Sequence, residues 1–365
     1  MKIVICGGHL TPALSIIEEL SKKDDIYYFG RKHALEGDRS VSLEYELVSK
    51  LGIPFIEINT GRYQRKFTKY TIRSLMKVPG GLISAFRQLL KIKPDVVVGF
   101  GGYVSVPVCF AAKILKIPVV IHEQTLEAGD ANRLISKIAD KVCISFSTSK
   151  RFFEENKVVL TGNPLRRGLF DQRTSKYSVL AKPIIYVTGG SLGSHALNVL
   201  ISESLGRLLK KYTIIHQTGD AEEFKDFEKL LEYKNNSDLK ERYILSKYFS
   251  VEEIGEILKN SDMVIGRAGI NTVSELIVFK KPALLIPLPV SQKNEQLKNA
   301  MFLKKLGLSE VLEQNELSSD SFIDLVDTMM GNLDKYYLRE KQQYFPQNSA
   351  KKIIEVIYAS AKSSD

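Results

Sequence analysis

One pattern constrains the fold of this 365-residue chain more than any other: an apolar strand, a pair of glycines and a helix follow one another twice. The pattern reads KIVICGGHLTPALSIIEEL at residues 2–20 and PIIYVTGGSLGSHALNVLISESL at residues 183–205. Uniformly apolar strands are typical of parallel sheets whose two faces are both covered by helices. The sequence therefore predicts an α/β fold with two doubly wound, Rossmann-like domains.

Short apolar strands alternate with amphipathic helices along the rest of the chain. In a first domain, residues 1–162, we expect strands at Lys2–Cys6, Ile26–Phe29, Phe55–Ile58, Val96–Phe100, Val119–Glu123, Lys141–Ser145 and Val158–Thr161. In a second domain, residues 163–345, we expect strands at Ile184–Thr188, Thr213–Gln217, Arg242–Leu245, Met263–Arg267 and Ala283–Pro287. The boundary falls at TGNPLRRG, where glycine and proline interrupt the pattern. We expect residues 346–365 to form a helix that packs back on the first domain.

Composition narrows the class of protein. A 44% hydrophobic and 26% charged sequence is typical of a globular protein, and no stretch approaches the roughly 18 apolar residues of a membrane span. The N-terminus lacks the apolar run of a signal peptide. The cysteines Cys6, Cys109 and Cys143 are widely separated, so we expect reduced core thiols without a disulfide or a zinc site. These features predict a cytoplasmic protein.

The net charge of +10 is concentrated in one segment, residues 62–93, which has nine Lys or Arg and no Asp or Glu. Cations mixed with apolar side chains suit an anionic lipid surface, although a nucleic-acid site or an ordinary solvated helix pair would also be basic. The residues that we assign to a membrane patch are Arg65, Lys66, Lys69, Arg73, Leu75, Met76, Lys77 and Phe86.

Glycine turns indicate the kind of ligand. No stretch matches the dinucleotide fingerprint G-x-G-x-x-G, a Walker A loop or a metal-binding Asp-x-Asp pair. The chain has four separate turns instead, at Gly7-Gly8, Gly101-Gly102, Gly189-Gly190 and Gly269. Because helix N-termini and exposed amides bind phosphate without a cation, the sequence predicts a diphosphate ligand held with no metal and no cofactor.

The first turn carries a histidine. His9 follows Gly8 at the carboxyl end of a predicted strand, where open α/β sheets bind their ligands. We expect Thr11 to cap the following helix and Pro12 to occupy its first position. A histidine that only hydrogen-bonds its own loop is the alternative.

A second turn suggests a ribose site. In GRAGINTVSEL, residues 266–276, a strand ends at Arg267, Gly269 forms the turn, and Asn271 or Thr272 is expected to cap the helix. A carboxylate at Glu275 can accept hydrogen bonds from both hydroxyls of a ribose. The alternative is that Glu275 only complements the helix dipole.

Six stretches distributed along the chain are distinctive: VVVGFGGYVSVP, PVVIHEQTLEAGDANR, TGNPLRRG, TGGSLGSHALN, GRAGINTVSE and NEQLKNA. In this order and spacing they resemble the MurG family of glycosyltransferases over nearly the whole chain. The resemblance implies a GT-B fold, two Rossmann-like domains facing across a cleft. It also implies inverting, metal-independent transfer of N-acetylglucosamine from its UDP donor to lipid I, undecaprenyl-diphospho-muramoylpentapeptide, which gives lipid II for peptidoglycan.

The resemblance also assigns the site residues. It implies donor contacts at Thr125, Arg166, Ser191, Val251, Ile270, Asn271, Thr272, Val273, Ser274, Glu275 and Gln296. It implies acceptor or diphosphate loops at Cys6, Gly7, Gly8, Gly101, Gly102, Tyr103 and Glu123. Because His9 lies where the acceptor enters, it is our candidate for the base that takes the acceptor proton. The segment 62–93 falls where the family docks on the membrane, which implies a peripheral enzyme on the cytoplasmic face, with other cell-wall enzymes as possible partners and no nucleic acid.

Three departures from the family pattern bear on the sugar and acceptor contacts. Cys6 stands where the family has Thr, within a first loop that lacks the usual first glycine pair. Thr125 replaces an Asn, and Glu295 replaces the first Gln of a Gln-Gln pair. Two enzyme classes remain as alternatives, a transferase for another lipid such as diacylglycerol and a UDP-sugar epimerase. A nucleic-acid-binding protein would leave the glycine turns unexplained.

Overall fold

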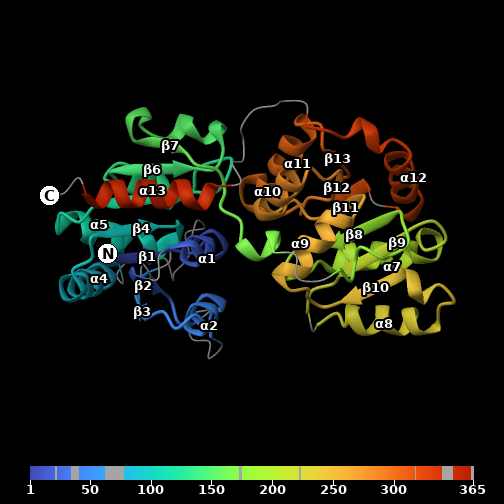
Figure 1. The fold of residues 1–365 in the computed structure, drawn as a ribbon, viewed down its shortest axis with the longest axis horizontal. Coiled ribbons are helices and arrows are strands. Elements are labelled where there is room, and N and C mark those ends of the chain that lie inside the picture. The colour runs from blue at the N-terminus through green and yellow to red at the C-terminus, as the bar shows by residue number, and fades with distance from the viewer. Residues whose placement is uncertain are drawn as a thin grey trace. The chain divides into compact units, whose positions relative to one another are not determined.

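The computed structural model describes residues 1–20, 23–33, 41–61, 78–171, 175–221, 223–316, 318–338 and 348–362, except the side chain of Gln292. It divides into two units, residues 1–166 with 344–365 and residues 167–343 (Figure 1). Each unit has its own parallel sheet with helices on both faces, so the predicted pair of doubly wound α/β domains is confirmed.

The first unit contains seven parallel strands in the order β3-β2-β1-β4-β5-β6-β7. These strands are β1 (Lys2–Cys6), β2 (Asp25–Gly30), β3 (Phe55–Glu57), β4 (Val96–Gly99), β5 (Val119–Glu123), β6 (Lys141–Ile144) and β7 (Val158–Leu160). The chain first extends the sheet on one side of β1 and then returns to place β4 on its other side. The order therefore reverses between β1 and β4, and ligands of open α/β sheets bind at such switch points.

Side chains of β1 alternate between two hydrophobic cores. Ile3 and Ile5 pack with α1 (Leu10–Glu19) and α13 (Ser349–Lys362), whereas Val4 and Cys6 pack with α4 (Val78–Ile92) and α5 (Gly102–Ile114) on the opposite face. The helices of this unit are α1 (Leu10–Glu19), α2 (Leu43–Lys50), α4 (Val78–Ile92), α5 (Gly102–Ile114), α6 (Asp130–Ser136) and α13 (Ser349–Lys362), with 3-10 turns η1 (Ser147–Phe152) and η2 (Glu155–Lys157). Figure 1 shows α13 as the red helix that lies along this sheet.

The second unit contains six parallel strands in the order β10-β9-β8-β11-β12-β13, with its switch point between β8 and β11. The strands are β8 (Ile184–Thr188), β9 (Thr213–Gln217), β10 (Tyr243–Ser246), β11 (Met263–Gly266), β12 (Ala283–Leu285) and β13 (Ser309–Val311). The helices are α7 (His195–Leu208), α8 (Asp226–Asn236), α9 (Val251–Asn260), α10 (Ile270–Phe279), α11 (Glu295–Lys305) and α12 (Ser319–Met330). The 3-10 turns are η3 (Arg167–Phe170), η4 (Lys240–Arg242), η5 (Gln292–Asn294), η6 (Gln314–Glu316) and η7 (Leu333–Lys335).

Three local predictions are wrong. The sequence analysis missed β13, because its sequence SEV is short and half polar. Thr11 does not cap α1, which begins at Leu10 after His9 and has no side-chain cap, so Pro12 is the third residue of the helix and not the first. Neither Asn271 nor Thr272 caps α10, because the helix begins at Ile270 after Gly269. At both helices the true cap position leaves the first backbone N–H groups without a side-chain acceptor.

Replacing two helical glycines by alanine should change the stability of the protein in opposite directions. A Cβ added at Gly255 in α9 would lie 2.0 Å from the Leu169 carbonyl oxygen of η3, whereas one at Gly206 in α7 would meet only the Tyr233 hydroxyl at 3.4 Å. We expect Gly255→Ala to destabilise the protein by about 1–3 kcal/mol because α9 must move from η3. Gly206→Ala, the matched control, should stabilise it by about 0.5–1 kcal/mol. Urea denaturation measures both changes, and equal effects would contradict the close approach.

Candidate functional site

Two backbone turns meet closely at the switch point of the first sheet. The amide of Gly8 donates to the Gly101 carbonyl at 3.0 Å, and the amide of His9 donates to the Phe100 carbonyl at 3.2 Å. Gly7 has φ +134°, and a Cβ there would lie 2.7 Å from the Gly101 oxygen. The turns therefore pack backbone against backbone, and only glycine permits this spacing.

Helices α1 and α5 begin at these two turns. Their cap positions are His9 and Gly101, and neither helix has a side-chain cap. Gly102 has φ +76°, and a Cβ there would lie 3.0 Å from the Gly8 nitrogen. Uncapped helix N-termini present N–H groups and a partial positive charge. The predicted diphosphate loops Gly7-Gly8 and Gly101-Gly102 thus meet at one edge of the sheet, with the chemistry of an anion site.

His9 lies between these loops. Its side chain is half-buried, its Nδ1 is buried without a hydrogen-bond partner among the described residues, and its ring lies close to Gly101. Burial lowers the pKa of His9 below its ordinary value of 6.5, and the Glu123 carboxylate partly opposes this shift. The histidine is therefore neutral at neutral pH, as a general base must be.

Glu123, at the end of β5, is fully buried and accepts four hydrogen bonds. Its Oε1 accepts from the Thr125 amide at 2.9 Å and the Thr125 hydroxyl at 2.6 Å. Its Oε2 accepts from the Gly129 amide and the Asn132 side chain, both at 2.9 Å. Thr125, the predicted donor contact, thus uses its hydroxyl within its own loop, where it also contacts the Glu127 carbonyl.

Two other residues of the predicted acceptor loops have structural contacts. Cys6 is fully buried, and its carbonyl accepts from the Phe100 amide at 2.7 Å and from the Ser105 hydroxyl at 3.3 Å. The Arg31 guanidinium lies over the Tyr103 ring, with its central carbon 5.7 Å from the ring centroid. Cys6 therefore supports the loop from below, and Tyr103 remains half-exposed in the first turn of α5.

Arg166, which we predicted at the donor diphosphate, forms an ion pair in the first unit. Its Nε and Nη2 donate to one oxygen of Glu18 on α1, at 3.1 and 2.9 Å. His122 has a structural role: Nε2 lies 3.3 Å from the Gly162 carbonyl oxygen and 3.2 Å from the Ser145 hydroxyl oxygen. Burial lowers the pKa of His122 to about 4, so this histidine is neutral.

Most of the predicted membrane patch, from Arg65 to Lys77, lies outside the described residues. The exception, Phe86, is half-buried on α4 and packs against the core. None of the helices described here has the length and apolarity to cross a membrane.

At the second switch point, the turn after β8 is also built on close backbone contacts. A Cβ at Gly193 would lie 2.0 Å from the Thr218 carbonyl oxygen, and one at Gly189 would lie 2.5 Å from the Ser194 nitrogen. Ser191, predicted near the diphosphate, is exposed in this turn. Ser194 caps α7 by accepting from the Leu197 amide at 3.4 Å.

Arg267, at the end of β11, connects four loops of the second unit. Its Nε donates to the Ser194 hydroxyl at 2.9 Å and its Nη2 to Gln314 Oε1 at 2.8 Å. Its Nη1 donates to the carbonyls of Ile286 at 3.0 Å and Pro287 at 3.3 Å. Arg267 is 7% exposed, so this buried side chain fixes the turn after β8.

Glu275 lies in the second turn of α10 and is half-buried. Burial raises the pKa of Glu275 to about 7, and no hydrogen-bond donor reaches its carboxylate among the residues described. This places a half-buried carboxylate beside a switch point. Asn271 and Thr272 are half-buried, whereas Ile270, Val273 and Ser274 have buried side chains that leave only backbone for a ligand.

The two remaining predicted donor contacts lie at other loops of the same edge. Gln296, half-buried in α11, accepts from the Leu288 amide at 3.0 Å through its Oε1. Val251 begins α9, next to Phe249, whose ring packs edge-on against Tyr177 and Tyr186.

Sequence reasoning missed two side chains that hold these loops. Gln217 ends β9 and bonds the turns at Gly190 and Phe249. Ser105 donates to the Gly101 carbonyl at 2.7 Å in the first unit. A polar residue at the last position of an apolar strand is the available signal for Gln217.

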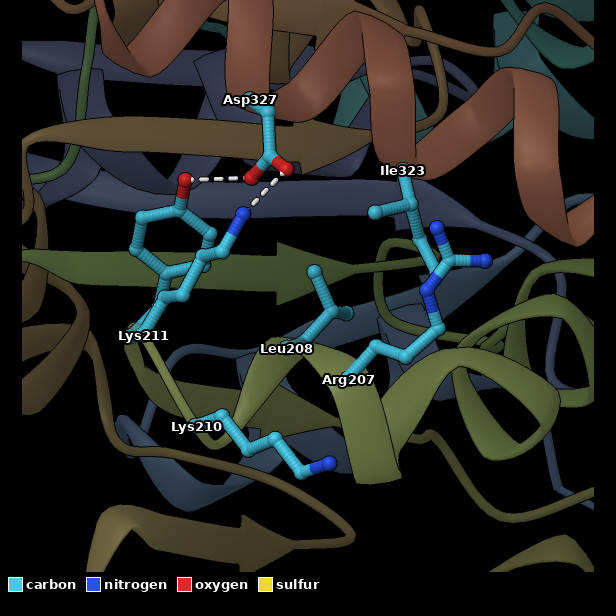
Figure 2. Close-up of a pocket in the computed structure, with 7 residues that line it drawn as sticks. Arg207, Leu208, Lys210, Lys211, Ile323 and Asp327 are labelled. Atoms are coloured by element: carbon cyan, nitrogen blue, oxygen red, sulfur yellow. Dashed lines mark hydrogen bonds and ion pairs between the residues drawn. The ribbon is translucent and has the colours of Figure 1, made fainter.

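A cavity of about 140 Å³ in the second unit belongs to neither candidate site. It lies at the far end of α7 and is lined by Arg207, Leu208, Lys210, Lys211, Tyr212, Ile323 and Asp327 (Figure 2). Asp327 accepts from Lys211 and from the Tyr212 hydroxyl, both at 2.6 Å. Among the described side chains, no group of three or more His, Cys, Asp or Glu could hold a metal ion.

Comparisons with known proteins agree across the chain. Residues 6–144 match the glycosyltransferase family 28 N-terminal domain, and residues 184–357 match the glycosyltransferase family 28 C-terminal domain. A UDP-N-acetylglucosamine–N-acetylmuramyl-(pentapeptide) pyrophosphoryl-undecaprenol N-acetylglucosamine transferase of Clostridium tetani is 36% identical, covering 98% of this chain and 97% of its own length. The transferase of the same name from Clostridium perfringens is 34% identical, and the match covers 99% of this chain and 98% of that protein.

Solved structures give the same result. MurG of Acinetobacter baumannii is 26% identical, with a TM-score of 0.72 over 98% of this chain and 99% of that one. A UDP-GlcNAc 2-epimerase from Neisseria meningitidis, bound to UDP-GlcNAc, shares the fold with a TM-score of 0.66 at 16% identity, over 98% and 100%. The predicted GT-B fold class is therefore confirmed. The chain belongs to the MurG family of UDP-N-acetylglucosamine–N-acetylmuramyl-(pentapeptide) pyrophosphoryl-undecaprenol N-acetylglucosamine transferases.

Proposed function

We propose that this protein transfers N-acetylglucosamine from UDP-N-acetylglucosamine to lipid I and so forms lipid II for peptidoglycan. The observation that carries the proposal is the pair of switch points, where close glycine turns lead into helices and the N-termini of α1, α5 and α10 have no side-chain cap. The reaction needs two anion sites, because donor and acceptor each carry a diphosphate. Relatives with this activity in their names match both units over nearly their whole length.

The second unit is the donor domain in this proposal. The turn from Gly189 to Gly193 supplies backbone amides for the diphosphate. Glu275 accepts hydrogen bonds from the two ribose hydroxyls. Backbone near Phe249 and Val251 contacts uracil, and Gln296 meets the sugar hydroxyls. The carboxylate of Glu275 supports this assignment, because burial raises its pKa and hydroxyl donors from a ligand would stabilise its ionised form.

The first unit is the acceptor domain. The acceptor diphosphate lies over the turns at Gly7-Gly8 and Gly101-Gly102, at the uncapped N-termini of α1 and α5 and next to His9. We assign Nε2 of His9 to the acceptor hydroxyl, because Nδ1 is the buried nitrogen. Its neutral state lets it take the proton as the hydroxyl attacks the anomeric carbon from the face opposite UDP, which inverts that centre. The Glu123 carboxylate then favours the imidazolium that forms.

Transfer without a metal follows from how these anion sites are built. Charge develops on the departing UDP, and backbone amides with helix N-termini stabilise such charge without reorganising. Arg166, the last residue of the first unit before the boundary, is the cation that the family resemblance assigns to the donor diphosphate, and here it is paired with Glu18. We therefore propose a metal-independent reaction.

The described part of α4 supports docking on a membrane. Its exposed face carries Ile83 and Leu90, 52% and 48% exposed, on the same side as Arg87 and Lys91. Helix α5, which packs against α4, ends in the 61% exposed Ile114. Apolar side chains among cations suit the headgroup region of an anionic leaflet. We propose peripheral attachment to the cytoplasmic face, where lipid I would be reached.

An activity screen tests the function. The purified protein is incubated with UDP-N-acetylglucosamine and EDTA, with lipid I, diacylglycerol or no lipid, and UDP release is followed together with the lipid product. Release with lipid I alone supports the proposal. Release with diacylglycerol would assign another lipid acceptor, and a 2-epimer of the donor sugar formed without lipid would assign an epimerase.

The role of His9 gives one prediction. We expect His9→Ala to lower kcat by about a hundredfold or more, because the acceptor hydroxyl loses its base, while the dissociation constant of UDP stays within about twofold. Steady-state kinetics with lipid I and calorimetric titration of UDP measure the two quantities. His9→Gln, which keeps a polar side chain in the loop, serves as the control for loop geometry and should be equally slow. Wild-type turnover in either variant would remove His9 as the base.

The raised pKa of Glu275 predicts pH-dependent donor binding. The free protein ionises Glu275 near pH 7, and ribose hydroxyls bind the ionised form, so affinity for UDP-N-acetylglucosamine should rise by up to about tenfold from about pH 6 to about pH 8. This ligand is chosen over UDP because its phosphates do not titrate in that range. The Glu275→Gln variant should bind more weakly and lose the pH dependence. The same pH profile in both proteins would leave Glu275 with only its effect on the helix dipole.

The exposed face of α4 gives a third prediction. Replacing both Ile83 and Leu90 by Glu should weaken binding to vesicles of anionic phospholipid by about tenfold or more, because apolar insertion is lost and repulsion is added. Vesicle sedimentation measures the change. Leu43→Glu, at a 59% exposed residue of α2 on the opposite face of the sheet, is the control and should bind normally. Equal losses in both proteins would speak against docking through α4.

A further inference from the structure

Gln217 joins two loops of the second unit through a single side chain. Its Nε2 donates to the Gly190 carbonyl at 3.2 Å, and its Oε1 accepts from the Phe249 amide at 3.3 Å. The residue is the last of β9 and is 5% exposed. Its carboxamide therefore makes two directional contacts, one to the turn after β8 and one to the turn after β10.

The contact with Gly190 fixes the direction of the next amide. The Gly190 carbonyl accepts from Gln217 and also from the Gly193 amide at 3.2 Å. The Gly190–Ser191 peptide is trans, so its N–H points opposite to its C=O. The Ser191 N–H is thus directed away from Gln217, and it has no acceptor among the described residues. β9 lies on one side of β8, and β11 with the Gly269 turn lies on the other.

The contact with Phe249 holds the second loop. The Phe249 ring packs edge-on against Tyr177 and Tyr186, with centroids 6.0 and 6.4 Å apart, and its amide is tied to Gln217. The loop is therefore fixed on its apolar side by ring contacts and on its polar side by the carboxamide. The loop leads directly into α9, which begins at Val251.

We propose that Gln217 is a positioning residue for a nucleoside diphosphate: one carboxamide directs the Ser191 amide at the diphosphate and sets the Phe249 loop against the base. This inference rests on the proposed function, because it takes the second unit as the donor domain. Gln217 touches no ligand itself. It sets the spacing between the part of the site that binds phosphate and the part that binds the base.

Three variants separate this role from a general effect on stability. Gln217→Met has a similar volume and loses both hydrogen bonds. Gln217→Glu keeps the acceptor for the Phe249 amide and loses the donor to Gly190. Thr213→Val, the matched control, loses one buried side-chain bond, from Thr213 to the Ala181 carbonyl, at the opposite end of the same strand. Affinities for uridine and for UDP are measured by competition with a fluorescent UDP analogue, and thermal unfolding is recorded for each protein.

The ratio of the UDP affinity to the uridine affinity reports on the phosphate contact alone. For Gln217→Met we expect uridine affinity to fall about fivefold and this ratio to fall about fivefold more, since each lost bond contributes a small net free energy. Gln217→Glu is tested with uridine only, because the added negative charge repels phosphate. The affinity of this variant for uridine should stay within about twofold of the wild-type value. Thr213→Val should unfold at a lower temperature with both affinities unchanged.

A wild-type ratio in Gln217→Met would overturn the inference, and so would unchanged uridine affinity in that variant. If Gln217→Met does not fold, Gln217→Asn takes its place, since the shorter carboxamide loses both contacts, and the same criteria apply. Hydrogen exchange adds an independent measurement: UDP should protect the peptide around Ser191 in the wild type and protect it less in the variant. Absence of UDP binding by the wild type would instead overturn the proposed function itself.

Discussion

The close approach of backbone to backbone at the strand ends is the constraint on which the rest of this structure depends. At the first switch point the turns after β1 and β4 are joined by the Gly8–Gly101 and His9–Phe100 hydrogen bonds. Such contact leaves no room for side chains, so the polar surface at that edge consists of amides and helix N-termini. An anion is the ligand that this surface suits, and His9 is the titratable side chain that the turn itself carries to it.

The second unit reaches a similar result with more help from side chains. The turn after β8 is exposed and rich in glycine. Without side-chain contacts such a turn would adopt several conformations. Arg267 fixes the Ser194 end from below, and Gln217 fixes the Gly190 end from the side. The site is thus preorganised by buried polar groups with few alternative partners, and such groups hold a loop because breaking their bonds in the interior is costly.

The strand pattern made the architecture predictable, because buried parallel strands are uniformly apolar and twelve of them could be located that way. β13 was not predictable, since its three residues carry a serine and a glutamate and depend on pairing with β12. The loops were predictable from their glycines, but the helix starts were not. Thr11 and Asn271 are residue types that often cap helices, yet both lie inside helices that begin one residue earlier. Long-range partners such as Arg166 with Glu18, or Gln217 with Phe249, join residues whose proximity no local pattern encodes.

The charge beneath the turn after β8 favours an anionic ligand, as the proposed metal-independent binding of a diphosphate requires. The four acceptors of Arg267 are a hydroxyl, two carbonyls and a carboxamide, and all of them are neutral. No carboxylate among the described residues cancels its charge, although burial makes that charge costly and lowers the pKa of the guanidinium. Because the partners of the buried Arg267 guanidinium are all neutral, an anion bound at the turn after β8 would balance its charge. Arg267 therefore both shapes the turn after β8 and favours negative charge there, which is part of what a divalent cation does in metal-dependent sites.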